Sequence, residues 1–207
     1  MGRLRKFNVE TPVSTKLIKE LSVGDEIYLT GEVVTARDMA HARAIKLGLE
    51  GGAVPNELEE AVVYHCGPIV KRADGGWKII SAGPTTSARM ENLEPKFVKL
   101  FRIRIIVGKG GMGMGTALAL KESPGVYCVF VGGAGALAAR MVKRVIGVKW
   151  LDLGVPEALW KLEVENFGPL TVTIDSKGKN LHEELKLKVK GNLDSVLKGD
   201  VAWRSRL

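Results

Sequence analysis

Residues 102–121, which read RIRIIVGKGGMGMGTALALK, indicate the fold class of this chain. The segment at 102–107, in which Ile and Val predominate, predicts a strand. Glycines follow it directly, and the residues after them favour a helix that ends near Lys121. A strand, a glycine-rich turn and a helix in succession are typical of an α/β domain.

The pattern continues on both sides of this segment. After it come a glycine cluster and a helix rich in Ala, Leu and Met, with strands expected at 126–131, 145–150 and 170–174. Before it we expect strands at 26–34, 61–64 and 77–81, a turn at 71–76, and a helix at 36–47 that Gly48 ends. We therefore predict an α/β fold with mixed sheets, in which helices follow the strands.

The composition is that of a globular protein, with 45% hydrophobic and 26% charged residues. We expect residues 1–207 to form one domain, with a core at about 11–180 and a charged C-terminal tail at 181–207. No apolar run approaches the roughly 18–20 residues of a membrane span. The basic N-terminus is not followed by the apolar stretch of a signal peptide, so we expect a cytoplasmic protein that is not bound to a membrane.

Cysteine and histidine are scarce. Cys66 and Cys128 are the two cysteines, and each is predicted to be a small buried hydrophobic residue in a reducing compartment. The three histidines, His41, His65 and His182, do not combine with cysteines and acids in the spacing of a metal site. No complete metal site and no catalytic serine–histidine–acid set is therefore apparent.

The net charge of +8 predicts an anionic partner. Nucleic acid is the general candidate, but aromatic residues make up only 6% and the basic residues are spread along the chain. No stripe of alternating basic and aromatic residues is present, so we expect no nucleic acid. A small dianionic substrate or an acidic partner subunit accommodates the charge equally well.

Three loops combine glycine or hydroxyl residues with a cation, and the first surrounds Arg37. Arg37 and His41 are four residues apart and would share one face of a helix. A helix that begins near Ala36 would add its N-terminal dipole to Arg37 in binding an anion. The alternative is a solvated face, in which Arg37 pairs with Asp38 or Glu32 and His41 is a surface histidine.

The second loop, from Gly83 to Arg89, carries three consecutive hydroxyls on Thr85, Thr86 and Ser87. One hydroxyl could cap the N-terminus of a following helix, which is the alternative interpretation. The other hydroxyls, the backbone amides and the guanidinium together suit a carboxylate, which arginine binds in a bidentate fork.

The third loop follows the strand at 102–107. Gly108, Gly110 and Gly113 match the G-x-G-x-x-G dinucleotide fingerprint. However, the acidic residue that would bind a ribose is missing after the next strand, so the signal is weak. What remains is a loop whose amides and Lys109 can approach an anion, or whose glycines serve tight packing.

Together these loops resemble the β subunit, or cluster-free half, of the class I fumarase and L-tartrate dehydratase family. The matching segments lie in the expected order between about Thr11 and Asn180: Thr35-Ala36-Arg37-Asp38 with His41, Tyr64-His65-Cys66-Gly67-Pro68, Gly83-Pro84-Thr85-Thr86-Ser87-Ala88-Arg89-Met90, Gly108-Lys109-Gly110-Gly111-Met112-Gly113, Trp160-Lys161-Leu162-Glu163-Val164, Phe167-Gly168-Pro169-Leu170 and Ile174-Asp175-Ser176-Lys177-Gly178. This many matches in order are specific, whereas each loop alone is not.

The resemblance implies a swivelling β/β/α domain that closes on a partner domain with a [4Fe–4S] cluster, one iron of which binds substrate as a Lewis acid. The cluster would belong to an α subunit in an α2β2 assembly, and this chain would hold no metal. By position, the substrate-binding residues would be Arg37, Thr85, Thr86, Arg89 and Lys109. The catalytic residues would be Thr85, His41 and Lys109. Thr85 would abstract the proton and would need activation by Lys109 or Arg89.

The implied reaction is the reversible hydration of fumarate to L-malate, with dehydration of L-tartrate as the alternative. Two more distant alternatives are a nucleotide-binding domain and a basic RNA-binding domain. The first would need the missing ribose-binding acid, and the second would need aromatic positions for stacking.

Overall fold

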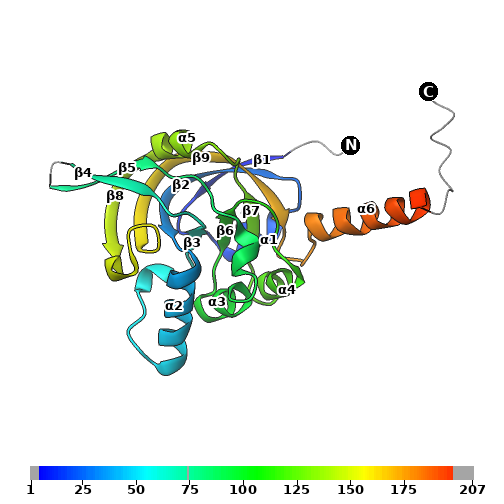
Figure 1. Cartoon of the computed structure of the whole chain (residues 1–207), viewed down its shortest axis with the longest axis horizontal. Coiled ribbons are helices and arrows are strands. Elements are labelled where there is room, and N and C mark those ends of the chain that lie inside the picture. Colours follow the sequence, from blue (N-terminus) through cyan, green and yellow to red (C-terminus); the bar gives the residue numbers. More distant parts are fainter. Residues whose placement is uncertain (1–4, 74, 198–207) are drawn as a thin grey trace.

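The computed structural model describes residues 5–73 and 75–197. Figure 1 shows a body of strands with helices around it and one helix that extends from it. The strands are β1 (Lys6–Glu10), β2 (Glu26–Thr35), β3 (Val62–Tyr64), β4 (Ile69–Ala73), β5 (Gly76–Ser81), β6 (Ile105–Gly108), β7 (Val126–Val129), β8 (Val142–Lys149) and β9 (Leu159–Ile174). The helices are α1 (Thr15–Glu20), α2 (Asp38–Glu50), α3 (Glu94–Phe101), α4 (Met114–Glu122), α5 (Gly135–Met141) and α6 (Leu181–Leu197), with 3₁₀ segments η1 (Asn56–Leu58), η2 (Ser87–Met90) and η3 (Leu151–Leu153).

The main sheet is mixed and closes on itself. Strands β2, β3, β6 and β7 are parallel, and the long strand β9 runs antiparallel to both β2 and β7. Because β9 pairs with both outer members of this series, the five strands form a closed ring. β1 pairs with β2, and β8 pairs with β9. β4 and β5 form a separate hairpin. The predicted α/β class with mixed sheets is confirmed.

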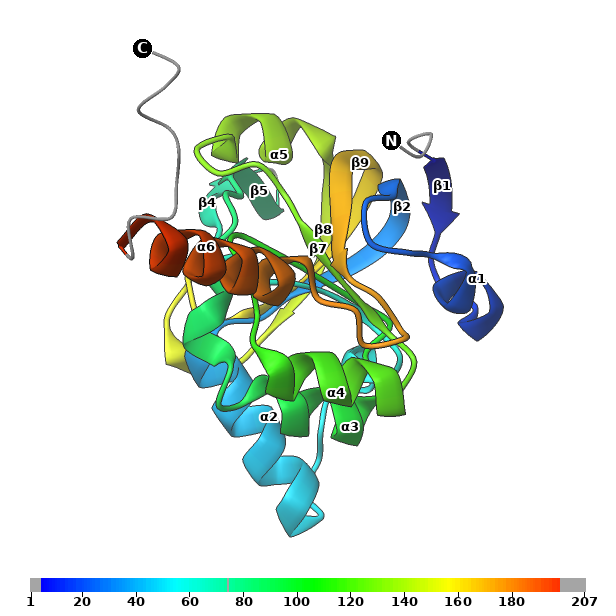
Figure 2. The ribbon, with the colours of Figure 1, turned by 90° about the vertical axis from the view of Figure 1, so that its right-hand side faces the viewer.

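Two apolar cores lie on the two faces of this ring, because successive side chains of a strand point to opposite faces. In β6, Ile105 and Val107 join the core inside the ring, whereas Ile106 joins the core under the helices. Figures 1 and 2 show α2, α3 and α4 gathered on one side of the body and α5 on the other. The ends of the strands are therefore held between two packed layers.

Several element boundaries differ from the expectations. α2 does not end at Gly48 but continues to its C-cap Gly51, whose left-handed φ of 69° ends the helix. Gly48 instead faces α3, where an added Cβ would lie 3.4 Å from Phe101. The segment 71–76, expected to be a turn, belongs mostly to the β4–β5 hairpin, and the strand expected at 170–174 is only the end of β9. Pairing with distant strands sets these lengths, which local patterns do not reveal.

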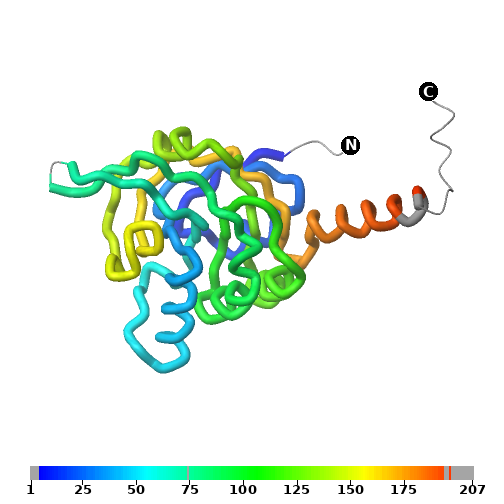
Figure 3. The backbone as a smooth tube through the Cα atoms, in the orientation of Figure 1, coloured from blue at the N-terminus to red at the C-terminus, as the bar shows by residue number. Residues whose placement is uncertain are grey.

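α6 extends away from the body, as Figures 1 and 3 show. The charged tail expected from residue 181 is therefore helical as far as residue 197, and residues 198–207 lie outside the described residues. Leu185, Leu187 and Val189 are exposed on this helix. No helix in the described part of the chain is long and apolar enough to cross a membrane.

Candidate functional site

The predicted site residues follow the ends of parallel strands. Arg37 comes after β2, and Lys109 comes directly after β6, which is the neighbour of β3 in the sheet. In α/β sheets, ligands bind outside the carboxyl ends of the strands, where loops from neighbouring strands meet. The fold therefore brings the first and third loops to the same edge of the sheet.

Hydrogen bonds hold the second loop, around Thr85, between the ends of β3 and β6. The amide of Thr85 donates to the carbonyl oxygen of His65 at 2.7 Å. The amide of Lys109 donates to the carbonyl oxygen of Thr85 at 3.2 Å. The amide of Ser87 in turn donates to the carbonyl oxygen of Lys109 at 3.0 Å. Thr85 and the exposed Thr86 therefore lie beside Lys109.

The hydroxyls of the second loop do not act as helix caps. Thr86 occupies the N-cap position of η2, but its side chain makes no capping hydrogen bond. Thr85 Oγ1 accepts a hydrogen bond from Arg89 Nη2 at 3.0 Å. Ser87 points inward and is fully buried. The capping interpretation is therefore wrong, and the guanidinium of Arg89 polarises the Thr85 hydroxyl.

Arg89 also joins the second loop to the first. Its Nη2 donates to Asp38 Oδ2 at 3.1 Å, at the start of α2. This ion pair is about half exposed, since the side chains of Arg89 and Asp38 have 47% and 40% of their surface accessible. The Arg89 guanidinium therefore lies at the surface, between the Thr85 hydroxyl and the N-terminus of α2.

Arg37 is the N-cap residue of α2 and pairs with Glu157 rather than with the expected Asp38 or Glu32. Arg37 Nε lies 3.2 Å from Glu157 Oε1. Gly67 makes room for this side chain, because a Cβ at that position would lie 2.4 Å from Arg37 Nη1. The expected pairings fail because Asp38 and Glu32 contact other cations.

Lys109 is exposed, and no carboxylate of the described residues lies within ion-pair distance of it. Its side chain passes Gly132, where an added Cβ would lie 3.1 Å from Lys109 Cδ. Among the predicted cations, Arg37 and Arg89 have acidic partners, whereas Lys109 has its charge available for a ligand.

The expectation of a surface histidine at position 41 is wrong. His41 is fully buried, with Nδ1 2.8 Å from the carbonyl oxygen of Arg37 and Nε2 3.3 Å from Glu94 Oε2. Although Arg37 and His41 are one helical turn apart, the imidazole points into the core of α2 and α3. Its role in proton transfer stays a prediction, and in the first loop its ring contacts the backbone of Arg37.

Two residues next to His41 have no role in the sequence analysis. His65 Nε2 lies 3.1 Å from the same oxygen of Glu94, and His65 Nδ1 lies 2.9 Å from Ser87 Oγ. Both residues are fully buried. His65 belongs to a segment that carries the family resemblance, but nothing in the sequence connects it with Glu94 or His41. Only the fold brings the three side chains together, with one potential metal-ligand atom on each.

The glycine-rich loop does not present a free helix N-terminus. The carboxylate of Glu91 accepts hydrogen bonds from the amide of Gly113 at 2.6 Å and from the amide of Thr116 at 3.1 Å. Thr116 Oγ1 donates to the same carboxylate at 2.8 Å. An internal carboxylate therefore occupies the position that a pyrophosphate takes in a dinucleotide-binding domain. This contact weighs against the nucleotide-binding alternative.

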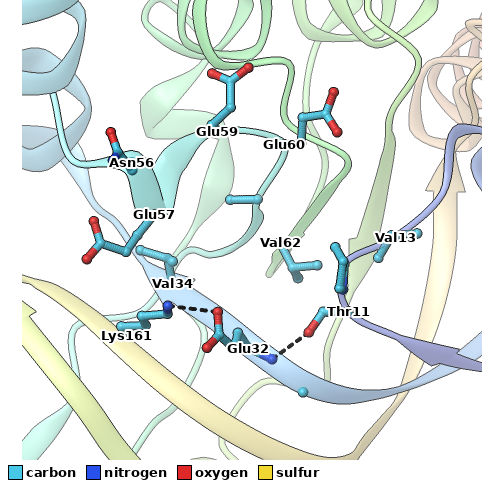
Figure 4. Close-up of a pocket in the computed structure, with 13 residues that line it drawn as sticks. Thr11, Val13, Glu32, Val34, Asn56, Glu57, Glu59, Glu60, Val62 and Lys161 are labelled. Carbon is cyan, nitrogen blue, oxygen red and sulfur yellow. Dashed lines mark hydrogen bonds and ion pairs between the residues drawn. The ribbon is translucent and has the colours of Figure 1, made fainter.

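Figure 4 shows a groove elsewhere on the surface that is unsuited to a dianion. The charged residues of its lining are four glutamates and Lys161. Cations already pair with the glutamates: Glu32 with Lys161, Glu57 with Lys149, Glu59 with Arg102 and Glu60 with Arg104. A dicarboxylate would be repelled by these side chains and would find no unpaired cation among those that line the groove.

The cysteines do not fit an iron–sulfur cluster. Cys66 and Cys128 are free thiols and fully buried. Burial raises the pKa of Cys66 to about 12 and raises the pKa of Cys128 as well. Cluster ligands are thiolates, and a cluster usually takes four of them. Two protonated, buried thiols cannot supply this ligand set.

These features define a class of protein: an α/β domain that presents cations and hydroxyls at the carboxyl edge of parallel strands. A family model described as "Fumarase C-terminus" matches residues 2–185. The chain belongs to this fumarase C-terminus family.

Three relatives are similar to most of this chain. A protein of Methanocaldococcus jannaschii, provisionally named L(+)-tartrate dehydratase subunit beta, is 45% identical over 186 residues, which are 89% of this chain and 95% of that protein. The L(+)-tartrate dehydratase subunit beta of Escherichia coli is 41% identical over 176 residues, or 85% of this chain and 86% of that protein. A longer protein of Geobacillus stearothermophilus, provisionally named fumarate hydratase class I, is 41% identical over 183 residues, or 88% of this chain but 34% of that protein.

Proposed function

We propose that this chain is the β subunit of an iron–sulfur hydro-lyase that interconverts fumarate and L-malate. The observation that carries the proposal is the hydrogen bond from Arg89 to the Thr85 hydroxyl, beside the backbone of Lys109 and next to the start of α2, where Arg37 lies. The names of the relatives support a hydro-lyase, and two of the three support L-tartrate as the second candidate substrate.

The three cations are proposed to bind the two carboxylates of the substrate. Lys109 has no internal counter-charge among the described residues. The half-exposed pair of Arg89 with Asp38 contributes only about 0–1 kcal/mol, so a substrate carboxylate can replace Asp38 at little cost. Arg37 remains held by Glu157 and would present its outer nitrogens. Thr86 is proposed to donate its exposed hydroxyl to the same carboxylates.

Thr85 is proposed to remove the proton from the carbon next to the hydroxyl-bearing carbon of malate. A threonine hydroxyl is a weak base at neutral pH, so it needs cationic neighbours that favour its alkoxide. Arg89 Nη2 donates to Thr85 Oγ1 at 3.0 Å. Lys109 lies beside Thr85, because its backbone forms a β-bridge with the next residue, Thr86. The proton-transfer half of the reaction is thereby assigned to this chain.

The [4Fe–4S] cluster is assigned to a partner α subunit, because the two buried thiols of this chain do not fit one. Two relatives are named as β subunits, which implies such a partner. The longer relative has room in the same polypeptide for a second half, since this chain matches only 34% of it. We propose an α2β2 assembly in which this domain closes on the cluster-bearing domain.

Co-expression with candidate α subunits, followed by anaerobic purification and assays with fumarate, malate and tartrate, tests the proposal. We expect activity only in the complex, with fumarate and malate as the better substrates. Faster turnover of L-tartrate would favour the alternative substrate. If neither a complex nor activity forms with any candidate α subunit, the β-subunit assignment is wrong.

A further inference from the structure

We propose that His41, Glu94 and His65 form a metal-free network, held together by protons, that positions the three loops of the site. This inference assigns positioning roles to residues beneath the proposed substrate pocket, and it rests on the proposed function only for its effect on catalysis. His41 lies on α2, His65 directly follows β3, and Glu94 is the first residue of α3. All three side chains are fully buried.

The contacts determine where the protons lie. The carbonyl oxygen of Arg37 can only accept a hydrogen bond, so His41 Nδ1, 2.8 Å away, carries a proton. His41 Nε2 faces Glu94 Oε2 at 3.3 Å, and a neutral ring would there turn a lone pair toward a carboxylate oxygen. A second proton must therefore lie between these two atoms.

His65 completes a network without net charge. Its Nε2 lies 3.1 Å from Glu94 Oε2 and is assigned the proton that faces this oxygen, while its Nδ1 lies 2.9 Å from Ser87 Oγ and is assigned the role of acceptor. His41 is then an imidazolium, Glu94 a carboxylate and His65 neutral. A buried charge is stable only when it is paired in this way.

The environment of each group agrees with this assignment. Burial opposes a charge on His41, but Glu94 and the Arg37 carbonyl together raise its pKa above the ordinary value. Burial lowers the pKa of His65. For Glu94 burial acts in the opposite direction, yet the two imidazoles hold its pKa at about 2.

A divalent metal ion between these three groups fits less well. It would have only three protein ligands in a fully buried place, and a four-coordinate ion needs one ligand more. With a single carboxylate it would also leave one net positive charge buried. One extra proton gives a hydrogen to each histidine nitrogen that faces Glu94 and leaves no net charge.

The network connects all three loops. The His41 ring contacts the backbone carbonyl of Arg37, and the His65 ring contacts the Ser87 hydroxyl. The carbonyl oxygen of His65 also accepts a hydrogen bond from the Thr85 amide. The third loop packs on the same point, because a Cβ on Gly108 would lie 1.9 Å from Ser87 Oγ and 3.2 Å from His65 Nδ1. A change at Glu94 should therefore displace Arg37 and Thr85 together, although it contacts neither.

Nitrogen-15 NMR of the histidine side chains in the full-length chain at neutral pH tests the protonation states, with metal analysis of the same sample. We expect His41 with both ring nitrogens protonated, His65 neutral with its proton on Nε2, and no bound metal. Stoichiometric zinc or another divalent metal, or a neutral His41, would overturn the proposal. These measurements need no partner subunit, so they are independent of the proposed reaction.

Glu94→Gln tests the positioning role, since it keeps the side-chain shape and removes the charge. We expect His41 to become neutral, the Arg37 and Thr85 amide signals to shift, and kcat of the reconstituted complex to fall about tenfold to a hundredfold, with a smaller change in KM. Ser87→Ala, which removes the hydroxyl that bonds to His65 and leaves Glu94 in place, should shift the Thr85 amide and lower kcat less. If Glu94→Gln does not fold, the Thr85 amide shift and the kcat of Ser87→Ala test the positioning role in its place.

Asp25→Asn is the matched control, because Asp25 is also a buried carboxylate and pairs with Arg5 far from the site. It should lower stability but leave the Arg37 and Thr85 signals and the kcat of the complex unchanged. Unshifted amide signals in both site variants, or equal losses of kcat in Asp25→Asn and Glu94→Gln, would show that Glu94 has only a general structural role.

Discussion

Replacing Gly108 by alanine tests how closely the three loops are packed. An added Cβ would lie 1.9 Å from Ser87 Oγ, 3.1 Å from Tyr127 Oη and 3.2 Å from His65 Nδ1. A contact below 3 Å is not tolerated, so Ser87 must move. Ser87 is fully buried, and its movement breaks the hydrogen bond with His65.

The expected cost follows from these contacts. A hydrogen bond of this kind contributes about 1 kcal/mol to stability, and overpacking a rigid core costs about 1–3 kcal/mol. We therefore expect Gly108→Ala to lower the free energy of unfolding by about 2–4 kcal/mol. Because Ser87 and Thr85 belong to the same loop, turnover of the reconstituted complex should fall as well.

Urea unfolding of the full chain, followed by circular dichroism, measures this free energy. Gly147→Ala is the control, because an added Cβ there would have nothing within 4 Å, and we expect a change within about 0.5 kcal/mol. If Gly108→Ala were as stable as the control, the close packing of the three loops around His65 would be refuted.

Three further outcomes are expected of the site. Thr85→Ala in the reconstituted complex should lower kcat strongly and leave KM nearly unchanged, and normal turnover would remove Thr85 from the chemistry. Replacing Arg89 or Lys109 by methionine should cost about 2–5 kcal/mol in kcat/KM, and unchanged steady-state kinetics would exclude that side chain from carboxylate binding. The isolated chain should contain no cluster after anaerobic reconstitution, because Cys66 and Cys128 are buried and protonated, and stoichiometric iron and sulfide would contradict this.

Much of the fold was predictable because its signals are local. The apolar strand, glycine turn and helix of 102–121 occur in the order expected, and the strand predicted at 26–34 differs from β2 by a single residue at its end. The strand at 126–131 was predicted two residues too long. The boundaries that failed depend on distant partners: Gly48 packs on α3 instead of ending α2, and β9 gains its length from three other strands.

The meeting of the cationic loops was also within reach of the sequence. Arg37 and Lys109 each follow a parallel strand, and the ends of such strands share an edge of the sheet. The acidic partners of these loops could not be predicted from the sequence. Glu157 as the partner of Arg37 and Glu91 as the cap of the glycine-rich loop come from segments with no local signal for either contact.

Sequence alone was sufficient for the α/β class, the family resemblance and the list of cations and hydroxyls, because residue type and short-range spacing carry that information. The tertiary structure was needed for the inward turn of His41, for its junction with His65 and Glu94, and for the bond between Arg89 and Thr85 Oγ1. His41 and Glu94 lie on different helices, and neither helix alone specifies the other's position. The packing of α2 and α3 against the sheet makes one carboxylate the common partner of two buried imidazoles.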